Sequence, residues 1–196
     1  GQDYTPLSGT VTIPAGATSA DVDVAVLDDN LVEANETVTV TLGGITTAAP
    51  GIAVDNANKT ATVSIADDDT ATVSIARIGD GAEAATPVAG KFQVTQSKPS
   101  STDTVLSYTV NGTATPGAGN DYALLSGTVT ISAGSTTADI DVVVVNDSVV
   151  ESNETVILTL AGITSGRPQI TIDQANKAAT VSITDDDAAK VSIAKF

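Results

Sequence analysis

Acidic residues gather at the ends of strand-like runs, and they are the residues of this chain best suited to chemistry. They stand in "QDY", in the run "LDDNLVEANE" and in a triple aspartate. The first 69 residues hold eight of them: Asp3, Asp28, Asp29, Glu33, Glu36, Asp67, Asp68 and Asp69. If the runs between them form a β-sandwich, loops that are distant in sequence meet at one pole. The eight carboxylates are therefore expected to converge.

Converging carboxylates favour a cation, because partly desolvated anions repel one another strongly. Calcium takes about six to eight oxygen ligands at roughly 2.3–2.6 Å and tolerates irregular geometry, which suits a cluster built from loops. Magnesium demands near-octahedral order and fits less well. Zinc prefers Cys or His, and the sequence contains neither. The pattern predicts calcium, while the alternative that these acids form a solvated surface stays open.

The elements that carry these acids show a period of two. Thr, Ser, Asp or Ala alternate with Val, Ile or Leu, and Gly, Pro, Asn and Asp separate the runs. No stretch has a sustained helical period. Strands are expected at 10–13, 20–26, 37–42, 61–65, 71–76, 92–96 and 105–110. About seven such strands make one antiparallel β-sandwich, so the fold class is all-β.

A tandem repeat organises the chain. Residues 1–78 align without a gap onto residues 119–196, an offset of 118, and 49 of the 78 positions are identical. The repeat predicts a module at 1–69 that lacks its first three strands. It then predicts a complete module at 70–187 and the first strand of a following module at 188–196. Two explanations of the missing strands stay open. Neighbouring chains can complete the first module in a filament, or the strands can simply have been left out.

The triple aspartate stands between modules, at 67–69 and again at 185–187. In an extended chain Asp67 and Asp69 point to one side and Asp68 to the other. Two of the three can face a metal ion at the pole, and the third can face a second ion or the next module. A metal bound here is expected to stiffen the junction.

Composition excludes several classes of function. The 24 acids and 8 bases give a net charge of −16, which argues against nucleic acid and anionic membrane as partners. The sequence has no His, no Cys and no Met, so the commonest general base, disulfides and most transition-metal chemistry are missing. No apolar run has the length of a membrane span, and the start does not read as a signal peptide. The chain reads as a segment of something longer.

The combination of "DY", the run D-D-x-x-x-E-x-x-E and a terminal "DDD" resembles the Calx-β domain over essentially the whole chain. This family occurs in tandem in sodium–calcium exchangers and in large bacterial surface proteins. The resemblance implies an immunoglobulin-like sandwich that binds calcium ions at one pole. In the first unit it implies the eight acids named above as ligands. In the second it implies Asp121, Asn146, Asp147, Glu151, Glu154, Asp185, Asp186 and Asp187.

Two departures from the family pattern affect the second unit. Asn146 replaces the first aspartate of the acidic run, so this site is expected to hold fewer ions or to hold them more weakly. The family also has an acid just after the first strand, for which Asp80 and Glu83 are only nearby candidates.

The favoured function is a calcium-binding structural repeat of a large extracellular bacterial adhesin or surface filament, at the cell surface, with calcium rigidifying the modules and their joints. The partners expected are calcium, neighbouring repeats and other copies of the chain in a filament. The alternative is a calcium-sensing tandem of an exchanger-type regulator, in which paired modules usually diverge. An enzyme is not expected, since a catalytic case would rest on carboxylates better suited to metal. A glycan platform is not expected either, since such platforms usually display aromatic side chains.

Overall fold

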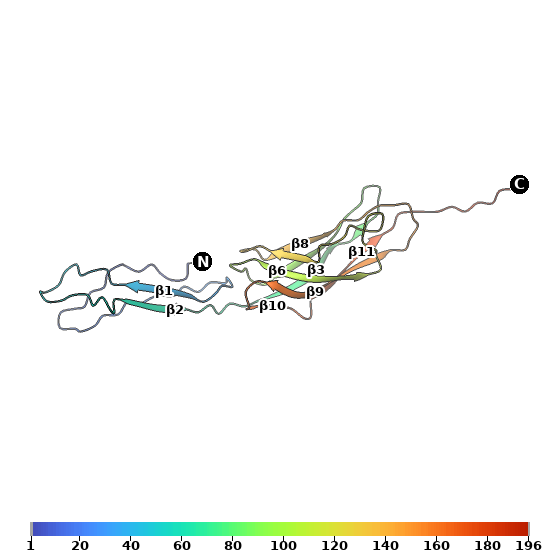
Figure 1. The fold of residues 1–196 in the computed structure, drawn as a ribbon. Coiled ribbons are helices and arrows are strands. Elements are labelled where there is room, and N and C mark those ends of the chain that lie inside the picture. Colours follow the sequence, from blue (N-terminus) through green and yellow to red (C-terminus); the bar gives the residue numbers. More distant parts are fainter. Residues whose placement is uncertain (1, 196) are drawn as a thin grey trace.

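The structure is a computed structural model that describes residues 2–195. All its regular elements in that range are strands. The described residues accordingly offer no helix that is long and apolar enough to cross a membrane. Figure 1 shows two parts placed end to end, with residues beyond β11 running outward as an extended segment. The expected all-β class is confirmed.

The second part is a sandwich of two sheets. One sheet has the order β10 (Ile170–Ile172), β3 (Ala71–Gly79), β5 (Gly90–Gln96) and β8 (Thr137–Val142). The other has the order β4 (Gly81–Ala82), β11 (Ala178–Thr184), β9 (Glu154–Ser165), β6 (Thr104–Gly112) and β7 (Thr128–Ile131). The strands expected at 71–76, 92–96 and 105–110 are confirmed as β3, β5 and β6. The sandwich has more strands than the expected seven because the short β4 and β10 pair in parallel at its edges.

The core lies between these sheets and follows the period of two. Val73 and Ile75 on β3, and Phe92 and Val94 on β5, are buried, and more polar side chains alternate with them. Burying side chains of this size contributes about 1.5–3 kcal/mol each to stability. With no Trp and few aromatic residues, the core is mainly Val, Ile and Leu.

The first part, called the first unit below, contains one antiparallel hairpin, and the second part is called the second module. The hairpin pairs β1 (Glu36–Thr41) with β2 (Thr60–Ile65). Its register equals that of β9 with β11: Glu36 lies opposite Ile65, as Glu154 lies opposite Ile183. These two strands were expected at 37–42 and 61–65 and are confirmed.

The strands expected at 10–13 and 20–26 are wrong, because the structure has no strand in either range. The equivalent strands of the second part, β7 and β8, pair with β6 and β5 respectively. The described part of the first unit has no counterpart of β5 or β6. Without a partner strand, an alternating sequence has no ladder of hydrogen bonds to hold it extended.

Candidate metal centres

The acidic pole of the second module is built around Asp121, which is buried. Asp121 lies in the loop after β6, and Gly112, the last residue of that strand, has a φ of 126° that a side chain would strain. A Cβ at Gly112 would also come within 2.0 Å of the Thr155 carbonyl oxygen. The Thr115 amide donates to Asp121 Oδ2 (2.5 Å), and the Val145 amide donates to the Asp121 carbonyl oxygen (3.0 Å). These bonds hold Asp121 against the loop that follows β8.

That loop carries Asp147 and Glu151 and is tied to the end of β11. The Val149 amide donates to Asp147 Oδ1 (2.7 Å), which closes a local turn. The Glu151 amide donates to Asp185 Oδ2 (3.2 Å). The acidic run and the triple aspartate therefore meet, as expected for loops at one pole.

Glu83 completes this pole, and it was not among the predicted site residues. It is 3% exposed, and its amide donates to the Thr184 carbonyl oxygen (2.9 Å) because β4 pairs with the end of β11. Asp80, the other candidate nearby, lies elsewhere. It pairs with Arg77 and accepts a hydrogen bond from the Ser182 amide (2.9 Å).

Two groups of three acids share Glu83. They are Glu83 with Asp147 and Asp187, and Glu83 with Asp121 and Glu151. Within each group one carboxylate oxygen per residue lies within 4.8 Å of the others. Spacings of this size allow one cation to contact oxygens from all three side chains.

The electrostatics of the pole are those of crowded anions. Burial, followed by the charge of Asp147, raises the pKa of Glu83. A hydrogen bond with Asp121, together with burial, raises the pKa of Glu154 to about 7. The pKa values of Glu151 and Asp187 are also raised, in both cases first by burial and then by neighbouring aspartates. Without a cation, several of these carboxyls hold protons more tightly than usual.

Several oxygens at this pole are buried without a hydrogen-bond partner. They are Glu83 Oε2, Asp185 Oδ1 and Asp187 Oδ2. An unpartnered buried carboxylate oxygen is costly unless something positive approaches it. Calcium accepts carboxylate oxygens from irregular loops, so the donor set fits this ion.

Not every predicted residue joins these groups. Asn146 and Asp186 are exposed and belong to neither group of three. Glu154 is hydrogen-bonded to Asp121. Asp186 is exposed while Asp185 and Asp187 are half-buried, which is the alternation expected along an extended chain.

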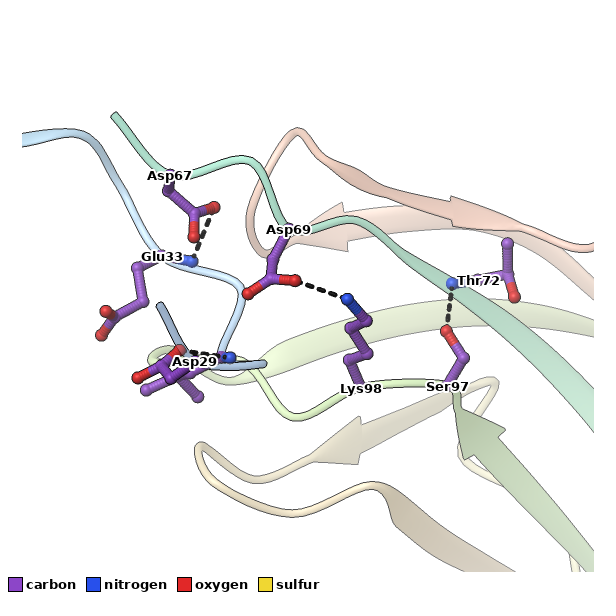
Figure 2. Close-up of polar contacts among 8 residues, drawn as sticks. Asp29, Glu33, Asp67, Asp69, Thr72, Ser97 and Lys98 are labelled. Atoms are coloured by element: carbon purple, nitrogen blue, oxygen red, sulfur yellow. Dashed lines mark hydrogen bonds and ion pairs between the residues drawn. The ribbon is translucent and has the colours of Figure 1, made fainter. Parts of the chain in front are cut away.

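The acids of the first unit also lie together. All eight of its predicted residues line one cavity of about 270 Å³. The Leu31 amide donates to Asp29 Oδ1 (2.8 Å) and the Glu33 amide to Asp67 Oδ2 (3.2 Å), repeating the contacts of the second module (Figure 2). A hydrogen bond with Asp3 raises the pKa of Glu36.

The first cluster is looser than the second. None of the tight groups of three acids found within residues 2–195 comes from the first unit. Among the described residues, the acids that line its cavity are the eight predicted ones and no others.

A lysine from the second module closes the first cluster instead. Lys98, in the loop after β5, places Nζ 2.5 Å from Asp69 Oδ1 (Figure 2). This hydrogen bond raises the pKa of Lys98, and Asp69 is only 7% exposed. The first cluster therefore sits at the junction of the two parts.

Val32 fixes the same junction. It is fully buried and belongs to the core cluster of the second module. Its amide donates to the Pro99 carbonyl oxygen (2.9 Å), and its carbonyl oxygen accepts from the Ser101 amide (3.1 Å). Gln169 adds a bond from Nε2 to the Glu33 carbonyl oxygen (3.1 Å). The acidic loop of the first unit is thus docked on its neighbour.

Comparisons with known proteins identify the family of the chain. The family model of the Calx-beta domain matches residues 1–69 and 80–187, and this family is a calcium-binding domain family. A comparison with curated proteins gave no match.

Three solved structures are similar to the chain. CBD12 from CALX1.2 is 21% identical, and the match covers 58% of this chain and 45% of that chain with a TM-score of 0.45. The calcium binding domain CBD12 of CALX1.1 is 24% identical, and the match covers 58% of this chain and 44% of that chain with a TM-score of 0.44. The apo-form Calx CBD1 domain is 21% identical, and the match covers 58% of this chain and 99% of that chain with a TM-score of 0.43. The chain spans less than half the length of the first two. The family model covers most of the sequence, and the chain belongs to the Calx-beta domain family.

Proposed function

We propose that this chain is a calcium-binding structural repeat in which calcium stiffens the modules and the joints between them. The observation that carries the proposal is Glu83, whose buried, unpartnered oxygen lies among the acids of both groups at the second pole. Glu83, Asp121, Asp147, Glu151 and Asp187 are the residues that hold the ion there. Calcium offsets their mutual repulsion and stabilises the folded module by mass action.

The same chemistry acts at the junction. Asp67 and Asp69 lie on the connection into β3, and the loop that reaches the second module through Val32 also contributes Glu33 to the cluster. A cation among these acids links the connection to the docked loop. The joint then resists bending, and an array of such modules becomes a stiff rod.

The setting we propose is extracellular, in a bacterial adhesin or a surface filament. A net charge of −16 with no cysteine suits a calcium-rich, oxidising medium in which metal takes the role of disulfides. The 49 identities among the 78 aligned positions favour one shared mechanical role over two divergent sensing roles. The partners are calcium, neighbouring modules and other copies of the chain. A catalytic role has no support in the acids, which are engaged at the poles.

Thermal unfolding tests the proposal. With 10 mM calcium and a dissociation constant of about 0.1 mM, binding adds about 2.7 kcal/mol. This raises the Tm of the second module by roughly 10 °C over the chelator value. Magnesium should give much less. Glu83→Gln should lose most of the calcium shift, whereas Asp103→Asn should keep it, since Asp103 lies at the other end of β6 and bonds the Ala133 amide. An equal calcium shift in Glu83→Gln and wild type would reject this centre.

A further inference from the structure

The corner where β6 ends lies beside the second acidic pole. β6 pairs with β9 as far as Gly112, which stands opposite Val156. The chain turns out of the sheet at Gly112, where a Cβ would come within 2.0 Å of the Thr155 carbonyl oxygen. Only glycine allows β6 to approach β9 this closely. The close approach brings the next residue, Thr113, against Thr155, which directly follows Glu154 in the sequence.

Thr113 and Thr155 are joined through a side chain as well as through the backbone. In a regular antiparallel pair, two opposite residues exchange bonds from amide to carbonyl oxygen. The Thr113 amide does donate to the Thr155 carbonyl oxygen (3.0 Å). In return, the Thr155 amide donates to Oγ1 of the Thr113 hydroxyl (2.9 Å). The hydroxyl therefore takes the place that a backbone carbonyl has in a regular ladder.

Neighbouring contacts strengthen this attachment. The Ala114 amide also donates to the Thr155 carbonyl oxygen (3.1 Å), and the hydroxyl oxygens of Thr113 and Thr155 are 3.4 Å apart. Together these contacts fix the beginning of the loop 113–121 to the start of β9. We call them the Thr113 clamp.

The other end of the same loop carries Asp121. The Thr115 amide donates to Asp121 Oδ2 (2.5 Å), and the Asp121 amide donates to the Thr115 carbonyl oxygen (3.2 Å). The Gly117 amide donates to the Tyr122 carbonyl oxygen (2.8 Å), which closes the loop on itself. Asp121 is therefore tied to Thr115, and Thr115 stands two residues from Thr113.

The clamp thus connects the two sides of the pole. Asp121 is hydrogen-bonded to Glu154, and it forms one of the tight groups of acids with Glu83 and Glu151. The clamp holds β9 at the residue after Glu154, and the closed loop carries Asp121 from the clamp to the pole. The place of Asp121 relative to β9 therefore depends on the clamp.

We propose that Thr113 is a positioning residue of the second pole: its hydroxyl holds the loop 113–121 on β9 and thereby sets the place of Asp121 among the carboxylates that bind calcium. The inference rests on the proposed function of this pole. Thr113 itself is exposed, carries no charge and belongs to neither group of acids. A partner that orients a ligand in this way changes the affinity for a metal without touching it.

Calcium titration of the isotope-labelled chain by two-dimensional NMR tests the proposal. Thr113→Val removes the hydroxyl and leaves the amide bonds of the clamp in place. Because one hydrogen bond is lost, calcium should bind the second pole about 3- to 10-fold more weakly. The Thr115 and Glu151 amides report on this pole. The Leu31 and Glu33 amides report on the first pole, which should titrate as in wild type.

Two variants separate positioning from a general loss of stability. Thr109→Val is the matched control, because the Thr109 hydroxyl also lies on β6 and donates to the Thr159 carbonyl oxygen (3.5 Å), away from the loop. It should bind calcium as wild type does. Thr113→Ser keeps the hydroxyl and should restore wild-type affinity. A merely structural role would lower the Tm in chelator and leave the calcium affinity unchanged.

Hydrogen exchange in chelator tests the clamp without metal. The Ala114 amide should exchange faster in Thr113→Val than in wild type, because its acceptor on β9 is held less firmly. Its exchange should be unchanged in Thr113→Ser and in Thr109→Val. An unchanged rate in Thr113→Val would overturn the clamp.

The outcomes distinguish this inference from the proposed function. Equal calcium affinity at the second pole of Thr113→Val and wild type would overturn the positioning role and leave the calcium centre standing. Second-pole amides that do not respond to millimolar calcium in the wild-type chain would reject the calcium centre itself, and the positioning role with it.

Discussion

The first unit and the second module share a repeated sequence, identical at 49 of 78 positions, and reach different structures. Val181 is fully buried and Val63 is 48% exposed, although both stand in the same "ATVSI" strand. Tyr122 is buried beside Asp121, whereas Tyr4 beside Asp3 is only half-buried. The difference shows that the local sequence gives a strand one apolar and one polar face. Whether the apolar face is buried in a core depends on the partner strands β3, β5 and β6.

The acidic poles differ for the same reason. The second pole has Glu83, delivered by β4 from the first third of the module, and it forms two tight groups of acids. The first pole keeps the equivalent loop contacts but has Lys98 of its neighbour as the positive charge beside Asp69. Within residues 2–195 the second pole therefore brings three acids at a time within reach of one cation, whereas the first pole does not.

A matched pair of substitutions at one repeat position should show the largest difference between the two parts. Ile170→Ala removes a buried side chain of the second module and should lower its free energy of unfolding by about 2–5 kcal/mol. Ile52→Ala, at the same repeat position but 63% exposed, should change it by less than about 0.5 kcal/mol. Urea unfolding followed by circular dichroism measures both. Similar losses would mean that the first unit has a core of its own.

The junction should respond to a second matched pair. Val32→Asp places a charge in the core of the second module and should undock the acidic loop, so the chain flexes about residues 67–69. Val150→Asp, 118 positions later, falls on a side chain that is 52% exposed and should change nothing. Small-angle scattering in calcium should show a broader distribution of intramolecular distances for Val32→Asp alone. An unchanged distribution would contradict the docking role of Val32.

Acid titration should sharpen the contrast between the poles in chelator. The pKa of Glu154 is raised from 4.5 to about 7 in the folded protein. Between these pH values the unfolded chain loses this proton and the folded module retains it. The free energy of unfolding therefore decreases as the pH rises. The stability of the second module should therefore fall as the pH rises from about 4.5 to about 7. Glu154→Gln should flatten this part of the Tm profile.

Calcium should also remove that decline, because a bound cation keeps the carboxyls ionised in the folded state. The Tm of the chain measured from pH 4.5 to 7 in chelator and in calcium checks this point. Parallel profiles in the two conditions would contradict a metal centre that includes this cluster.

The smallest effect is expected at Lys98. Lys98→Met removes the cation beside Asp69 and should loosen the junction in chelator. In calcium the metal supplies the positive charge, so scattering curves of Lys98→Met and wild type should agree. Lys91→Met is the control, since Lys91 pairs with Asp139 and Asp141 on the sheet surface. Loosening that persists unchanged in calcium would argue against metal at the junction.

Much of the fold could be predicted from the sequence, because alternation over β1, β2, β3, β5 and β6 is a local pattern. The same pattern failed at 10–13 and 20–26, where the described chain offers no partner strand. The meeting of the acidic run with the triple aspartate was predictable from the two ends of a sandwich. The Glu151 amide bond to Asp185 bears it out.

Glu83 and Val32 show what the sequence could not decide, since it offered Asp80 and Glu83 equally. Glu83 reaches the pole because β4 pairs in parallel with β11, a contact across a hundred residues of chain. Asp80 looked equally suitable but pairs with Arg77. Val32 is one apolar residue in an acidic loop, and only the docked neighbour shows that it is core. An acid within a short apolar segment just after the opening strand was the one signal available for Glu83.

Equilibrium dialysis against calcium shows whether the acidic poles bind the ion. The account predicts saturable binding that magnesium does not displace at equal concentration, with a dissociation constant of roughly 10⁻⁴–10⁻³ M, as in extracellular modules. Glu83→Gln should weaken or remove binding at the second pole, and Asp103→Asn should bind as wild type does. Sub-micromolar affinity would favour a calcium sensor over a structural repeat. No calcium bound by the wild-type chain at millimolar concentration would contradict the account.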